Sequence, residues 1–166
     1  DNQISKPSAP SVFDPVARHK TIYLNGPGGS GKTTRAIEFF CRSSDMIVLT
    51  PTHRLAKEMK QREVKSQIYH SFFRWCGDTW TPERMGKYYM PRIIILDEIC
   101  TVSLESLTIF LDWLLRENTA VIMCGDHGQP PPFTGQSPHE WLKTFVDYYE
   151  EITGDHRAID EHLKEF

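Results

Sequence analysis

The chain has 166 residues, 39% of them hydrophobic and 25% charged. This length is enough to bury a core, and this composition is unlike that of a disordered, collagen-like or coiled-coil protein. Its 19 Lys and Arg residues against 22 Asp and Glu give a formal net charge of −3, which excludes a strongly basic nucleic-acid clamp as a global property but allows a local basic patch. No apolar run approaches the ~20 residues of a membrane span and no signal peptide opens the chain, so no membrane partner is expected.

The predicted elements alternate along the chain in the manner of a parallel α/β fold. Residues 1–18 are expected to be a polar, Pro- and Ser-rich tail, and residues 19–166 one α/β domain. Apolar, β-branched runs predict strands covered on both faces; they are Thr21–Leu24, Met46–Thr50, Ile93–Leu96 and Ala120–Cys124.

Amphipathic stretches between these runs predict the helices. Two are expected at Lys32–Cys41 and Thr52–Gln61, and a third follows Ser103 as its N-cap. A fourth is expected from Ser137, with Pro138 in its first position and Glu140 completing a capping box, and a further strand at Tyr148–Thr153.

The cysteines and histidines carry little functional signal. Four dispersed cysteines without a CxxC pair favour a reducing, intracellular compartment; cytoplasm, nucleus and a viral replication site are not distinguished. Cys100 and Cys124 follow apolar runs, which predicts buried free thiols. The seven histidines show no HxxxH or HExxH spacing, so a structural zinc site has little support.

A glycine-rich loop between the first strand and the first helix contains GxxxxGK(S/T) in full. Its glycines allow successive N–H groups to point inward and form an anion nest at a helix N-terminus. Lys32 is expected to reach the β- and γ-phosphates of a nucleotide, and the Thr33 hydroxyl to ligate Mg²⁺. The predicted phosphate-binding residues are Gly26, Pro27, Gly28, Gly29, Ser30, Gly31, Lys32, Thr33 and Thr34.

Polar side chains follow the next two strands, at the sheet edge where this loop is expected. Asp97 and Glu98 end the Ile93–Leu96 run; Asp97 is predicted to hold Mg²⁺ and Glu98 to polarise an attacking water, which indicates hydrolysis. Gln129 follows the last apolar run, before three prolines. Its amide can donate to a phosphoryl oxygen and accept from water, which suits a γ-phosphate sensor.

The order GPGGSGKTT, LTPTHRLA, IILDE and GDHGQPPPF resembles the first RecA-like domain of superfamily 1 helicases, closest to the Pif1/RecD-like branch. The resemblance covers residues 21–157 and implies a three-layer RecA-like P-loop NTPase fold with a mainly parallel sheet, ATP as the nucleotide, and the roles already given to Lys32, Asp97, Glu98 and Gln129. It also implies that Arg157 approaches the γ-phosphate. The family's second RecA-like domain, which completes the ATP cleft, is absent from this sequence and is expected as a partner in the full-length protein.

The resemblance further implies single-stranded DNA as a partner, with RNA possible. Pro51, Thr52 and His53 match a segment that touches the DNA backbone, and His70 lies in a second such segment. Segment 51–65 carries five basic residues against two acidic ones, which suits a phosphate track, although a solvated helix explains the same charges. Four nearby aromatic residues suit either a base-stacking platform or the core; they are Phe72, Phe73, Trp75 and Trp80.

Three functions remain open at this point. The motifs favour the ATP-hydrolysing domain of a DNA helicase that translocates on single strands and unwinds duplexes in its full-length form. A P-loop nucleoside or polynucleotide kinase is the first alternative, disfavoured by Glu98 beside Asp97 and by the Gln129 loop. A non-catalytic P-loop interaction module is the second, and the intact Lys32 and Asp97 count against it.

Overall fold

The computed structural model is described for residues 20–28, 31–40, 45–73, 91–117, 119–130, 132 and 135–152, with the side chains of residues 39 and 40 left aside. Its elements in chain order are β1 (Thr21–Asn25), α2 (Lys32–Phe40), β2 (Met46–Thr50), α3 (His53–Gln61), β3 (Ser66–Ile68), α4 (Tyr69–Phe72), β4 (Ile93–Leu96), the short 3₁₀ helix η3 (Ile99–Thr101), α5 (Leu104–Arg116), β5 (Ala120–Gly125), α6 (His139–Phe145) and β6 (Tyr148–Glu151). Within this part of the chain, no helix has the length and apolarity to cross a membrane.

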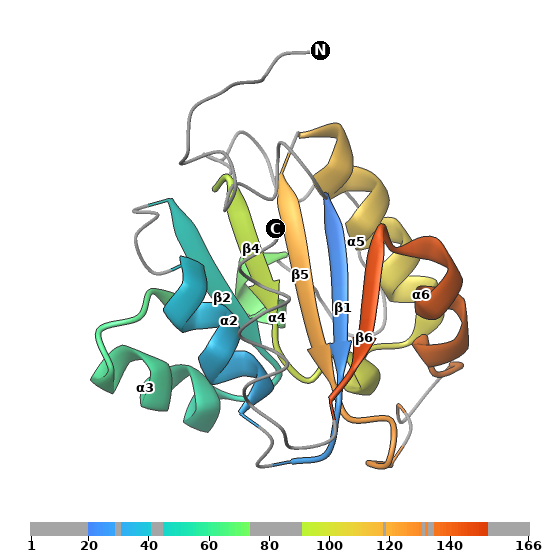
Figure 1. Cartoon of the computed structure of the whole chain (residues 1–166). Helices are drawn as coiled ribbons and strands as arrows, with labels where there is room; N and C mark the ends of the chain where they lie inside the picture. Colours follow the sequence, from blue (N-terminus) through green and yellow to red (C-terminus); the bar gives the residue numbers. More distant parts are fainter. Residues whose placement is uncertain are drawn as a thin grey trace.

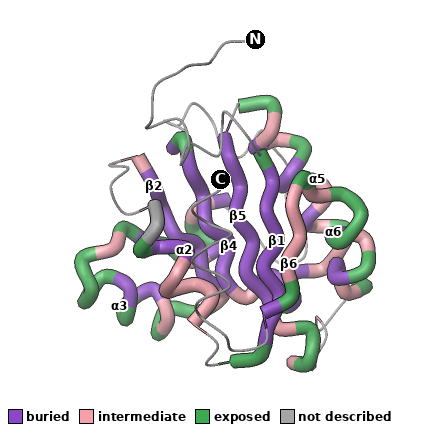
Figure 2. Tube along the Cα trace, viewed as in Figure 1, coloured by how far each residue is buried: buried purple, intermediate pink, exposed green. Residues whose placement is uncertain are grey.

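The strands form one six-stranded sheet in the order β3-β2-β4-β5-β1-β6, and every pairing in it is parallel. All carboxyl ends therefore meet at one edge, the lower one in Figure 1. The predicted α/β class with a parallel sheet is confirmed, and the central strands are buried along their whole length (Figure 2).

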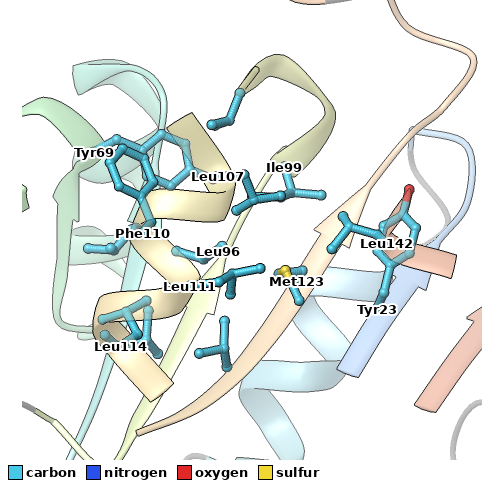
Figure 3. Close-up of a cluster of buried hydrophobic side chains, with 14 of the residues drawn as sticks. Tyr23, Tyr69, Leu96, Ile99, Leu107, Phe110, Leu111, Leu114, Met123 and Leu142 are labelled. Carbon is cyan, nitrogen blue, oxygen red and sulfur yellow. The ribbon is translucent and has the colours of Figure 1, made fainter. Parts of the chain in front are cut away.

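Alternate residues of the central strands build two cores, one on each face of the sheet. On one face α2 and α3 pack over residues such as Leu24, Val48 and Ile95. On the other face α4, α5 and α6 cover Leu96 and Met123, as Figure 3 shows. The result is a three-layer sandwich that holds the carboxyl edge of the sheet rigid.

Several local predictions hold in the structure. Ser103 is the N-cap of α5, accepting from Ser106 N–H at 3.2 Å. The helix predicted at Thr52–Gln61 is α3, which begins one residue later because Thr52 is its N-cap and accepts from Leu55 N–H. Cys100 and Cys124 are buried free thiols. The end predicted for the first helix, the end predicted for the last strand, and the predicted tail all include residues outside the described ranges.

The predicted start of the fourth helix is wrong. The helix α6 begins at His139, and its N-cap is Pro138, which makes no side-chain capping bond. The Ser137 hydroxyl accepts from the N–H of His139, only two residues on, at 3.4 Å, so it cannot fill the capping-box geometry. Glu140 instead faces Lys143, with Oε1 and Nζ 3.4 Å apart.

Candidate functional site

The glycine-rich loop leaves the carboxyl end of β1 beside the end of β5. The Gly26 N–H donates to the Gly125 carbonyl at 2.9 Å, which fixes the base of the loop to the neighbouring strand. Gly31 opens α2 with a φ of 81°, a left-handed conformation that glycine adopts without steric cost. The loop therefore turns directly into a helix N-terminus, whose N–H groups favour an anion.

Lys32 and Thr34 lie half-buried in the first turn of α2. The Lys32 ammonium donates to the Pro27 carbonyl at 3.3 Å, so the side chain folds back over the loop. The predicted loop residues Gly29 and Ser30 lie outside the described ranges. The described part places the lysine charge beside the glycine-rich loop, and its phosphate contact stays a prediction.

Thr33 and Asp97 meet across the gap between α2 and β4. The Thr33 hydroxyl donates to Asp97 Oδ1 at 2.7 Å, although the two residues are 64 positions apart in the sequence. Asp97 is only 7% exposed, and this burial raises the pKa of its carboxyl, against the lowering effects of the Thr33 hydroxyl, the Glu98 N–H and the Lys32 charge. A hydroxyl and a carboxylate at this separation are the hard oxygen donors that Mg²⁺ prefers, so the residues present fit that ion.

Glu98 follows directly in an unusual backbone conformation. Its φ and ψ are 51° and 50°, in the left-handed region that non-glycine residues seldom adopt. The residue is half-buried; burial raises the pKa of its carboxyl, and Asp97 adds to this, while Lys32 and Arg54 oppose it. Asp97 and Glu98 thus lie at one edge with Lys32, as predicted from the sequence.

The Gln129 loop is tied to the glycine-rich loop by Asp126, a residue that the sequence analysis did not single out. Asp126 Oδ2 accepts from the Gly28 N–H at 3.1 Å, and Oδ1 from the Gly128 N–H at 2.9 Å. The Gln129 N–H donates to the Asp126 carbonyl at 3.0 Å, and its side chain is half-buried. One carboxylate therefore bridges the predicted phosphate loop and the predicted sensor loop.

A second network connects the same loop to α6. The His127 N–H donates to Asn25 Oδ1 at 3.0 Å, and the His127 ring stacks on that of His139 with centroids 3.8 Å apart and planes 11° apart. The Tyr23 hydroxyl lies 2.7 Å from Nδ1 of the buried His139. Ligand atoms of His127, His139 and Glu140 lie within 4.8 Å of one another, a grouping that the sequence spacing did not reveal.

The residues predicted to touch DNA gather at the carboxyl ends of β2 and β3. These strands pair with Thr50 opposite Ile68, which brings segments 51–53 and 69–71 to the same edge. Thr52, His53 and His70 are exposed and Pro51 is half-buried. The Thr52 hydroxyl is already used as the cap of α3, at 3.3 Å from Leu55 N.

The basic residues of segment 51–65 lie on the exposed side of α3 and the turn after it. Arg54 is paired with Glu58 at 2.9 Å, so part of this charge is compensated. The other exposed basic residues are Lys57, Lys60, Arg62 and Lys65.

The aromatic residues near this edge belong to the core where they are described. Phe73 is fully buried and stacks on Phe110, with centroids 3.9 Å apart, so of the two alternatives, base platform and core, it belongs to the core. Phe72 is half-buried against the same core. Trp75, Trp80 and Arg157 lie outside the described ranges.

The parallel sheet, the glycine-rich loop after β1 and the acids after β4 define a P-loop NTPase domain of the RecA-like type. The model of the AAA_19 family, an AAA domain, matches residues 11–135. The chain belongs to this family. None of the curated proteins matches it.

Solved structures share the fold. The Pif1 helicase from Candida albicans aligns with a TM-score of 0.64 and 20% identity over 96% of this chain and 43% of its own. The Bacteroides Pif1 bound to ssDNA gives 0.59 and 23%, over 92% and 42%, and the Bacteroides Pif1 helicase in complex with ADP-AlF3 and ssDNA gives 0.58 and 23%, over 92% and 42%. The chain therefore spans less than half the length of these helicases.

Proposed function

We propose that this chain is the ATP-binding and hydrolysing domain of a superfamily 1 DNA helicase of the Pif1/RecD-like branch, and that it couples hydrolysis to translocation on single-stranded DNA and to unwinding in the full-length protein. The observation that carries the proposal is the Thr33–Asp97 contact of 2.7 Å, because it joins a P-loop hydroxyl to a strand-end carboxylate in the arrangement that holds a nucleotide-bound Mg²⁺. The solved structure with ADP-AlF3 and ssDNA has the same fold, which supports ATP and single-stranded DNA as ligands.

Each residue at the edge takes one task in this proposal. Lys32 and the loop N–H groups bind the β- and γ-phosphates, and Thr33 and Asp97 hold Mg²⁺. When bound, that ion neutralises charge on the phosphates. Glu98, whose pKa burial raises, orients the attacking water and accepts its proton. Gln129 senses the γ-phosphate, and Arg157 is proposed to approach it.

Domain closure completes the ATP cleft in this scheme. Residues 19–166 form one RecA-like domain, and a second RecA-like domain in the full-length protein closes on the bound nucleotide. Opening and closing of the two domains would move the strand held at the carboxyl ends of β2 and β3.

Two substitutions separate binding from hydrolysis. Lys32→Ala removes the cation that meets the phosphates and should abolish binding of a fluorescent ATP analogue. Glu98→Gln keeps the shape of the side chain and should bind the analogue normally while ATP turnover by the full-length protein stops. Lys143→Ala, an exposed lysine of α6, is the control and should change neither. Equal loss of nucleotide binding in both test variants would contradict the roles assigned.

The DNA side is tested by its salt dependence. Lys57 and Lys60 are exposed on α3, so a double Lys→Ala variant should weaken binding to single-stranded DNA. The slope of log K against log salt should become shallower by about 1.4, since each single-strand phosphate contact contributes roughly 0.7. An unchanged slope would show that these two lysines do not contact the phosphates of the strand. Stronger binding to an RNA strand of matched sequence would identify RNA as the nucleic acid along which the protein moves.

A further inference from the structure

The peptide unit between Asp97 and Glu98 sets the direction of the Glu98 side chain. The φ angle of Glu98, 51°, measures the rotation between this peptide unit and the Cα that carries the carboxylate. A left-handed conformation is unfavourable for an L-residue that is not glycine, so it persists where surrounding contacts hold it. Whatever fixes this peptide unit therefore fixes the direction of the Cα–Cβ bond from which the Glu98 carboxylate extends.

Hydrogen bonds hold the backbone on both sides of Glu98. Its N–H donates to Asp97 Oδ1 at 3.0 Å, and its carbonyl accepts from the Thr101 hydroxyl at 2.8 Å and the Thr101 N–H at 3.1 Å. The Asp97 carbonyl, at the other end of the same peptide unit, accepts from the Tyr69 hydroxyl. Tyr69 is thus the contact through which a distant segment, 28 residues earlier in the sequence, restrains this unit.

Tyr69 is anchored firmly enough to act as such a restraint. Its side chain is 2% exposed and belongs to the core cluster that also contains Phe110 of α5, drawn in Figure 3. It is the first residue of α4, directly after β3, and the exposed His70 follows it. One short helix therefore carries a group aimed at the acidic pair and, next to it, a residue proposed to touch the nucleic-acid strand.

We propose that Tyr69 is a positioning residue, which holds the Asp97–Glu98 peptide unit so that the Glu98 side chain starts in the direction of the attacking water. The inference rests on the proposed function, because it assigns a positioning residue to the same hydrolytic site.

The test is Tyr69→Phe in the full-length protein, which keeps the buried ring and removes the hydroxyl. The kcat of ATP hydrolysis with saturating single-stranded DNA should fall about tenfold, the scale of one lost positioning hydrogen bond, while the KM for ATP and the affinity for the strand stay unchanged. The control is Thr119→Val, which also removes a buried hydroxyl. The Thr119 hydroxyl lies at the opposite edge of the sheet, where it donates to the Pro91 carbonyl at 3.0 Å. It should lower the melting temperature to a similar degree and leave kcat unchanged.

A second measurement does not depend on activity. The Glu98 amide should exchange its hydrogen faster in Tyr69→Phe than in Thr119→Val, because its peptide unit has lost one of its restraints. Equal exchange in the two variants, or a DNA-stimulated kcat within twofold of the unsubstituted protein, would overturn the inference and leave the proposed function intact. Absence of DNA-stimulated hydrolysis in the unsubstituted protein would instead overturn the proposed function.

Discussion

Asp126 provides a sharp test of how the nucleotide site is organised. Its carboxylate accepts from the Gly28 N–H and the Gly128 N–H, at 3.1 and 2.9 Å, and so joins the glycine-rich loop to the Gln129 loop. Asp126→Ala deletes both acceptors. The loops then lose this side-chain bridge before nucleotide binds, and binding must supply the free energy that orders them.

The expected effect follows from these two hydrogen bonds. A hydrogen bond to a charged group contributes about 1.5–3 kcal/mol when it is protected from water. Because both glycines are exposed and Asp126 is half-buried, about 1 kcal/mol each is the better figure. Their loss corresponds to a roughly 30-fold weaker affinity for ATP. Asp126→Asn keeps one acceptor and should lose about fivefold.

The assay is a titration with a fluorescent ATP analogue, in the presence and absence of Mg²⁺. Asp112→Ala serves as the matched control, because Asp112 is an exposed carboxylate on α5 that pairs with Arg116 and has no part in the site. Its affinity should equal that of the unsubstituted protein. A dissociation constant for Asp126→Ala within twofold of the control would refute the bridging role.

Three further predictions follow from buried groups. Burial raises the pKa of Asp97, so ionisation of this carboxyl destabilises the fold as the pH rises through that pKa. Asp97→Asn still accepts from Thr33 and should raise the melting temperature at pH 7 but not at acid pH. The same substitution should abolish the effect of Mg²⁺ on nucleotide affinity. Phe73→Ala removes the fully buried ring stacked on Phe110 and should lower the free energy of unfolding by about 3–5 kcal/mol in urea titrations. Burial lowers the pKa of His139 below its ordinary 6.5, so the unfolded chain binds the proton first as the pH drops. The stability of the fold should therefore fall below about pH 6.5, and His139→Gln should flatten the melting-temperature profile in that pH range.

The sequence predicts the fold well where its signal is local. The long apolar runs become β1, β2, β4 and β5, and the Ser103 cap is found as predicted. The strand β3 was missed because it has only three residues, Ser66–Ile68. Its first residue is polar and is buried through a hydrogen bond from its hydroxyl to the Ala56 carbonyl at 2.8 Å, which no apolar pattern reveals.

The features of the candidate site also fall into those that a local sequence pattern predicts and those that it does not. Motif spacing predicts that Thr33 and Asp97 share an ion, and the structure brings their oxygens together. The bridging role of Asp126 depends on a partner 98 residues away, and the left-handed backbone of Glu98 lacks the glycine that would signal it. Both features arise from tertiary contacts, which a local sequence pattern does not encode.

We propose above all that the edge holding Lys32, Asp97 and Glu98 hydrolyses ATP under the control of a nucleic-acid strand. The most direct measurement is the steady-state release of phosphate by the full-length protein, with and without a single-stranded DNA oligonucleotide, beside the Glu98→Gln variant. We predict turnover that rises with added strand and is absent in Glu98→Gln. Turnover that is the same with and without the strand, or that survives in Glu98→Gln, would contradict the account.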